Sequence, residues 1–141
     1  MAKILLDTNI ILDMALGRHP FFEKALNLVL LASEQDVPLF VTATTITDIY
    51  YIIRKSKGRE AALGFVVQLL DIVQVAGVDR KVIEKALALQ DLKDFEDAVQ
   101  ASTAILHEID VLVTRNSDDF AGAPLQIFSP EEAISFLQAI A

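Results

Sequence analysis

The chain has 141 residues, of which 53% are hydrophobic, so it is long enough for one domain, residues 1–141, with a single core. Five glycines and four prolines are too few for a collagen-like or low-complexity chain. The lack of cysteine excludes disulfides, cysteine-based zinc sites and thiol nucleophiles. The net charge of −8 disfavours a nucleic-acid partner, unless bound cations or a local basic patch supply positive charge.

The first apolar segment ends at Asp7, which is too early for the apolar region of a signal peptide. The longest mainly apolar stretch, residues 25–32, is far below the length that spans a membrane. We therefore expect a soluble cytoplasmic protein that has no membrane partner.

Short apolar segments alternate with longer segments of helical spacing along the chain. The strand-like segments are nearly all apolar, as burial on both faces requires. The expected elements in chain order are a strand at 3–6, helix 20–34, strand 38–41, helix 42–55, helix 59–70, strand 72–75, helix 79–89, helix 94–107, strand 111–113, strand 126–128 and a last helix from 129.

Several helix ends carry residues with capping preferences. Thr42 or Thr44 can cap the helix that follows the second strand, and Gly58 can end it. The segment 129–132, Ser-Pro-Glu-Glu, places a cap, a proline and two acids at the start of the last helix. These signals support the boundaries that the apolar pattern predicts.

Strands that alternate with helices predict an α/β fold: a five-stranded parallel sheet flanked by helices on both faces. In such sheets, ligands bind beyond the carboxyl ends of the strands. Asp97 lies in the helix before the fourth strand, a position that this rule does not cover. The candidate ligands that do follow strands are Asp7 after the first, Asp48 after the second, and Asn116, Asp118 and Asp119 after the fourth.

Converging carboxylates require cations. Two unit charges about 4 Å apart repel by roughly 4 kcal/mol at an effective dielectric near 20, a large cost for a marginally stable domain. Carboxylate oxygens select hard ions, so Mg²⁺ or Mn²⁺ is expected. Ions of this kind can activate water and stabilise the oxygens of an in-line displacement, which fits hydrolysis of phosphodiesters.

Four motifs, in the same order and spacing over nearly the whole chain, resemble the PIN domain family. Each motif alone is weak, whereas four in register are a strong signal. The motifs are Asp-Thr-Asn-Ile-Ile-Leu-Asp at 7–13, Asp-Ile-Tyr-Tyr at 48–51, Lys-Asp-Phe-Glu-Asp-Ala at 93–98 and Val-Thr-Arg-Asn-Ser-Asp-Asp-Phe at 113–120.

The resemblance implies a PIN-like α/β/α fold and a Mg²⁺- or Mn²⁺-dependent endoribonuclease that uses a metal-activated water. Small single-domain members of the family are often toxins of VapC type, so the expected partners are an RNA substrate, a small antitoxin and a second copy in a homodimer. The RNA target, the existence of a cognate antitoxin, the number of metals and the oligomeric state do not follow from the sequence.

Carried over by position, the resemblance makes Asp7 the first metal ligand and Asp97 the third, with Asp48 as the remaining core catalytic ligand. Asp48 stands where the family usually has glutamate, so its carboxylate is retracted by about one methylene and a water-bridged contact to the metal is an option.

The fourth acidic position departs from the family pattern. Many relatives have aspartate where Asn116 stands, and the acids in this chain are Asp118 and Asp119, so which of the three completes the site stays open. Asp94 is an accessory candidate one helical turn before Asp97. Supporting roles fall to Thr8 and Asn9, which would orient the first carboxylate or a bound water.

Structural roles compete with these assignments. Asp7 and Asp94 can cap helices, Asp48 can favour the helix dipole, and Asp118 and Asp119 can be turn residues. The departures at Asp48 and at the fourth position also support an alternative: a catalytically weakened PIN-like domain that binds RNA or protein without cutting.

The other aspartates are expected at the surface or in turns. They are Asp13, Asp36, Asp71, Asp79, Asp91 and Asp110. A basic cluster over residues 54–59 reads equally as a local patch for nucleic acid or as a solvated helix end.

Overall fold

The computed structural model describes residues 2–141. Its elements, in chain order, are β1 (Ile4–Leu6), α1 (Thr8–Leu16), α2 (Phe21–Glu34), β2 (Leu39–Thr42), α3 (Ala43–Lys57), α4 (Arg59–Leu70), β3 (Gln74–Ala76), α5 (Arg80–Ala88), α6 (Phe95–Leu106), β4 (Val111–Val113), the 3-10 helix η1 (Ser117–Phe120), β5 (Gln126–Phe128) and α7 (Pro130–Ile140).

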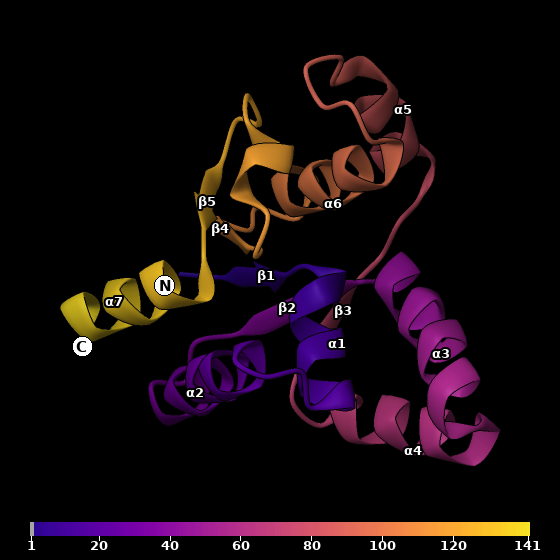
Figure 1. Ribbon diagram of the computed structural model, residues 1–141. Coiled ribbons are helices and arrows are strands. Elements are labelled where there is room, and N and C mark those ends of the chain that lie inside the picture. Colours follow the sequence, from indigo (N-terminus) through magenta and orange to yellow (C-terminus); the bar gives the residue numbers. More distant parts are fainter. Residues whose placement is uncertain (1) are drawn as a thin grey trace.

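The five strands form one sheet in the order β3-β2-β1-β4-β5, and every neighbouring pair is parallel. Helices α5 and α6 cover one face of the sheet, while α1, α2, α3, α4 and α7 lie on the opposite side (Figure 1). The predicted α/β/α fold is therefore confirmed. Within residues 2–141, no helix is both long and apolar enough to cross a membrane.

Alternation along the strands produces two cores, one on each face. Ile4 and Leu6 of β1 belong to the core beneath α1, α2, α3, α4 and α7, whereas Leu5 belongs to the core with α5 and α6. Successive strand side chains point to opposite faces, so three consecutive apolar residues serve both cores. This burial fixes β1 at the centre of the sheet and Asp7 at its carboxyl edge.

Side-chain caps begin the helices that carry the acidic residues. Asp7 caps α1, Thr42 rather than Thr44 caps α3, and Asp94 caps α6 by accepting from the backbone N–H of Glu96. Helix α1 ends at Gly17, whose φ of 60° is a left-handed conformation that costs glycine little.

Two expectations are corrected. The third strand is Gln74–Ala76 instead of 72–75, because the backbone turns after α4 and leaves Ile72 exposed before an edge strand begins. Asp13 is not a surface residue: it is fully buried in α1, where arginine side chains neutralise it. A sequence window cannot show the pairing with Arg115, because Arg115 is remote from Asp13 along the chain.

Candidate metal centre

Asp7 is a buried carboxylate at the point where β1 becomes α1. Its Oδ1 accepts from the backbone N–H of Thr8 at 2.7 Å, and its Oδ2 accepts from the hydroxyl of Thr114 at 2.8 Å. Burial raises the pKa of Asp7, while these two hydrogen bonds act in the opposite direction. These two bonds hold the Asp7 side chain in one orientation, while burial makes its charged form less favourable.

Asp97, in the first turn of α6, lies across the same cleft from Asp7. Its pKa is raised to about 7, first by desolvation and then by repulsion from Asp7, Asp94 and Asp119. Asp119 also raises the pKa of Asp7. The structure thus brings Asp7, Asp97 and Asp119 within electrostatic reach of one another, although they come from three distant segments of the chain.

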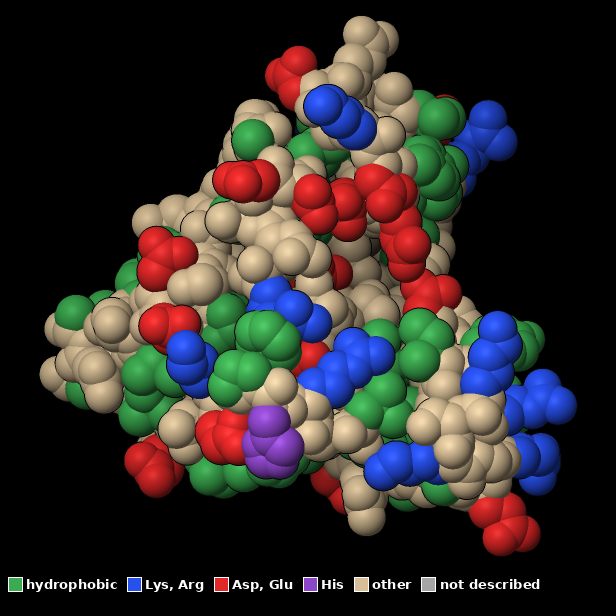
Figure 2. Space-filling model, viewed as in Figure 1, with side chains coloured by type: hydrophobic (Ala, Val, Ile, Leu, Met, Phe, Trp, Pro, Cys, Tyr) green, Lys and Arg blue, Asp and Glu red, His purple; other side chains and the backbone are tan. Residues whose placement is uncertain are grey.

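The cleft that these acids share has a volume of about 250 Å³. Figure 2 shows the acidic side chains gathered above a group of Lys and Arg side chains on one face of the molecule. The residues that line the cleft are Asp7, Thr8, Asn9, Leu12, Asp94, Glu96, Asp97, Asn116 and Asp119.

The loop after β4 carries the three candidates for the fourth acidic position, and the structure places them in different hollows. Asn116 and Asp119 line the cleft. Asp118 is exposed and lies instead in an adjoining hollow that Asp97 and Asp119 also line. The backbone N–H of Asn116 donates to the Thr114 hydroxyl, so one threonine connects this loop to Asp7.

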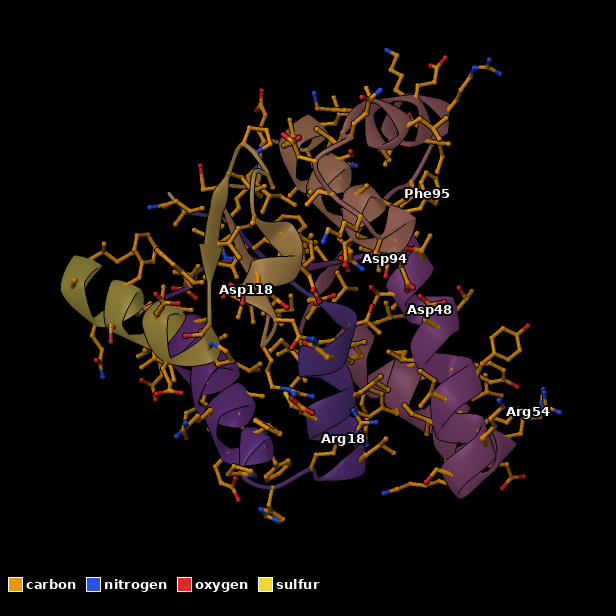
Figure 3. The ribbon with its side chains drawn as sticks, turned by 45° about the horizontal axis from the view of Figure 1, so that its top comes forward. Arg18, Asp48, Arg54, Asp94, Phe95 and Asp118 are labelled. Carbon is orange, nitrogen blue, oxygen red and sulfur yellow. The ribbon has the colours of Figure 1, made fainter. Side chains whose placement is uncertain are left out.

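Asp48 does not line the cleft. It borders a separate hollow with Phe95 and Glu96, and its hydrogen bond to Glu96 is the main reason that the pKa of Glu96 is raised to about 7. Figure 3 shows Asp48 on α3 near Asp94, with Asp118 on the other side of the cleft. Asp48 therefore reaches the acidic cleft through Glu96, which lines both hollows.

A buried polar cluster lies beneath the cleft. Gln100, one turn after Asp97, donates to the hydroxyl of Thr45 at 2.8 Å, and that hydroxyl also contacts the hydroxyl of Thr8 at 2.9 Å. The hydroxyl of Thr8 thus contacts α3 from α1, while the backbone N–H of Thr8 donates to Asp7. This cluster ties α6 to α1 and fixes the distance between Asp97 and Asp7.

The donor set fits a hard divalent cation. Its members are carboxylates with an adjacent amide, and the buried Oδ1 of Asn9 has no hydrogen-bond partner among the described residues. As the side chains stand, however, no three acids or histidines within residues 2–141 are close enough together to hold an ion. Rotation of side chains toward a cation would be needed to complete the coordination.

Comparison with known proteins identifies the family. A family model described as PIN domain matches residues 3–118, most of the chain. The chain belongs to the PIN domain family. The matched region contains the first three acidic motifs and most of the fourth, and it ends just before Asp119 and β5.

Solved structures share this PIN fold, whereas no curated protein sequence matches the chain. VapBC2 from Rickettsia felis bound to a DNA fragment from its promoter has a TM-score of 0.73 and 21% identity, and the match covers 90% of this chain and 97% of that chain. A toxin-antitoxin complex from Klebsiella pneumoniae has a TM-score of 0.69 and 28% identity, and the match again covers 90% of this chain and 97% of that chain. VapC20 from Mycobacterium tuberculosis, a sarcin-ricin loop cleaving toxin, has a TM-score of 0.67 and 16% identity, and the match covers 85% of this chain and 95% of that chain.

Three residues in or next to this PIN cleft were missed from the sequence: Glu96, which lines it, and Thr114 and Gln100, which hold its surroundings. Glu96 and Thr114 stand inside the quoted motifs, so their proximity to Asp97 and Asn116 was the available signal. Gln100 follows Asp97 at helical spacing on a helix whose buried residues are otherwise small or apolar. A buried glutamine at that spacing indicates a polar partner on the facing helix.

Proposed function

We propose that this PIN domain is a Mg²⁺- or Mn²⁺-dependent endoribonuclease and the toxin of a toxin-antitoxin pair, acting in the cytoplasm as a single domain over residues 1–141. The observation that carries the proposal is the meeting of Asp7, Asp97 and Asp119 in a cleft whose described lining contains no lysine or arginine. Carboxylates so arranged favour binding of a divalent cation and disfavour the apo state.

Each residue of the cleft would have a distinct task. Asp7 and Asp97 would hold the cation from opposite walls, and Asp119 would complete the site from the β4 loop, with Asn116 offering an uncharged oxygen. Thr114 fixes the orientation of Asp7 through its hydrogen bond. The cation, when bound, would neutralise the carboxylates, polarise the phosphodiester and lower the pKa of a water at its surface.

The assignments of Asp48 and Asp94 are weaker in this geometry. Asp94 lines the cleft but also caps α6. Asp48 would act through Glu96, either as an outer partner of the site or by tuning the charge of Glu96. We retain both as members of the wider metal site, along with Asp118 in the adjoining hollow.

Support for the toxin role comes from the solved structures, several of which are toxin-antitoxin complexes. RNA as substrate is supported by the RNA-cleaving neighbour from Mycobacterium tuberculosis. Exposed apolar side chains on α3 and α4, among them Tyr51, Leu63 and Val67, are surfaces that an antitoxin or a second copy in a homodimer would cover.

A second candidate function is a binding module for RNA or protein. The observation that favours it is the side-chain arrangement: Asp48 is engaged with Glu96, and no three acids within residues 2–141 form a ready metal site. A domain with a weakened site of this kind need not bind a divalent ion, so metal affinity separates the two candidates.

Titration of the chain with Mn²⁺ by calorimetry tests the proposal without knowledge of the RNA. Wild type should bind Mn²⁺, and Asp97→Asn should lose that binding. Asp71→Asn is the matched control, because Asp71 is an exposed aspartate at the end of α4 and outside the cleft. Equal binding by wild type and Asp97→Asn, or none by either at millimolar Mn²⁺, would reject the metal site and favour the binding module.

A further inference from the structure

A second pocket, of about 290 Å³, lies beside the acidic cleft. Arg115, which lines it, immediately precedes Asn116, which lines the cleft, so consecutive residues of one loop reach the two sites. The pocket is lined by Phe21, Lys24, Arg115, Ser129, Pro130 and Glu131. It combines an aromatic ring with basic side chains, unlike the cleft.

Arg115 is held rigidly in this pocket. Its Nε donates to Oδ2 of Asp13 at 2.7 Å and its Nη2 donates to Oδ1 at 3.2 Å, while its guanidinium lies 4.0 Å from the centroid of the Phe21 ring. A guanidinium has five N–H donors, and these bonds use two of them. The Arg115 side chain is still 24% exposed, so donors remain for a ligand in the pocket.

The buried carboxylate of Asp13 explains this arrangement. Its side chain is 1% exposed and approaches Arg18 at 3.8 Å as well as Arg115. One carboxylate therefore faces two guanidinium groups, which leaves one unbalanced positive charge at this place in a chain of net charge −8. Figure 3 shows Arg18 at the end of α1 that lies away from Asp94 and Asp118.

We propose that this pocket, defined by Phe21, Lys24 and Arg115, binds a nucleotide of the RNA strand adjacent to the scissile phosphodiester. Arg115 would bind the phosphate with its free donors, and the Phe21 ring, which is 39% exposed, would stack on the base. Asp13 is then a positioning residue that orients Arg115. This inference rests on the proposed function for the identity of the ligand.

Two physical features favour a nucleotide as ligand. Arginine forks match phosphate oxygens in geometry, and arginine and aromatic faces both stack on bases. Lys24 adds a flexible cation at the pocket rim, although Glu131 pairs with it at 2.7 Å in the structure. An RNA strand that leaves the cleft at Asn116 meets Arg115 directly, so one strand can occupy both sites.

The test is a titration of ¹⁵N-labelled protein with adenosine 5′-monophosphate, followed by NMR in EDTA. Without a divalent ion the acidic cleft repels the phosphate, so binding reports the pocket. Saturable shifts of the Arg115 and Phe21 signals are expected, with tighter binding than inorganic phosphate. Equal affinity for inorganic phosphate, or no shifts at millimolar nucleotide, would overturn the proposal.

Matched variants separate the pocket from general charge. Arg115→Lys keeps the charge beside Asp13 but loses the fork, so nucleotide affinity should fall roughly tenfold or more. Phe21→Leu should lower it roughly fivefold or more through lost stacking. Arg115→Gln and Arg54→Gln remove the same charge, and Arg54 lies at the far end of α3 (Figure 3). Equal losses for these two would contradict a specific pocket.

Mn²⁺ binding distinguishes failure of the pocket proposal from failure of the proposed function. Arg115→Lys and Phe21→Leu should bind Mn²⁺ as wild type does, because neither residue lines the cleft. A protein that binds Mn²⁺ but no nucleotide would retain the nuclease proposal and lose the pocket. A protein that binds nucleotide at Arg115 but no Mn²⁺ would retain the pocket and lose the metal-dependent function.

Discussion

Asp7 and Asp13 lie near the two ends of α1, and both carboxylates are buried, yet their surroundings are opposite in charge. Asp13 is neutralised by Arg115 and Arg18. Asp7 receives only a hydroxyl and a backbone N–H, and it faces Asp97 and Asp119. The Asp13 carboxylate is paired within the protein, whereas the Asp7 carboxylate forms no ion pair among the described residues, which is why we propose that it binds a cation. Buried charge therefore indicates function only where the protein does not supply the counter-charge itself.

The largest effect is expected for Asp7→Asn, which should change activity. Asp7→Asn should lower RNA cleavage by roughly 100-fold or more, since it removes a charge that would hold the cation. The metal-free protein should melt at the same or a higher temperature, because the amide relieves desolvation and repulsion at a site whose pKa is raised. Cleavage assays and thermal melts in EDTA test both parts; unchanged cleavage would remove Asp7 from the site.

The same substitution at the other end of the helix should act on stability. Asp13→Asn leaves two guanidinium groups without their buried partner, so the free energy of unfolding should fall by about 3 kcal/mol. Urea denaturation measures this loss, with Asp71→Asn as an exposed control expected within about 0.5 kcal/mol of wild type. An Asp13→Asn protein as stable as wild type would mean that the ion pairs contribute nothing net.

The acidic cleft should also make stability depend on pH. The folded pKa of Asp97 is about 7, above its ordinary value near 4, so the native state holds a proton that the unfolded chain has released. Stability of the metal-free protein should therefore fall as pH rises from about 4 to 7 and level off above. Mn²⁺ at pH 8 should restore it by binding the native state.

Thermal melts of wild type and Asp97→Asn in EDTA between pH 5 and pH 8 measure this dependence. The variant lacks the titrating carboxyl and should show a flatter profile. Glu96, whose pKa is also raised to about 7, should leave part of the slope in the variant. Identical profiles for the two proteins would show that the repulsion around Asp97 is absent in solution.

The smallest effect is expected at Asp48. Because Asp48 reaches the cleft only through Glu96, Asp48→Asn should lower cleavage by less than about tenfold, a loss typical of an outer partner. Loss of the Asp48 charge should move the pKa of Glu96 toward its usual range. Carbon-detected NMR of the Glu96 carboxyl follows that shift. A loss of cleavage as large as that for Asp7→Asn would make Asp48 a direct ligand.

Local patterns were sufficient for most of the fold. Three consecutive apolar residues at β1 and β4, and caps at Thr42 and Ser129, follow from burial on both faces and from the need to satisfy free backbone groups. The third strand was misplaced, because Ile72 and Val73 are apolar but belong to the turn after α4. An apolar pattern cannot distinguish a short edge strand from the turn that leads into it.

For the candidate site, the sequence by itself determined where the acidic motifs stand: Asp7 and Asp97 lie at recognisable places in the fold, and we propose that they carry the chemistry. Only the tertiary structure decided how the other acids divide, with Asp119 in the cleft, Asp48 turned to Glu96, and Asp13 paired with Arg115. The physical reason is that a carboxylate's role depends on the charge of its neighbours in space. Those neighbours come from segments that are distant along the chain, which only the packed sheet and helices bring together.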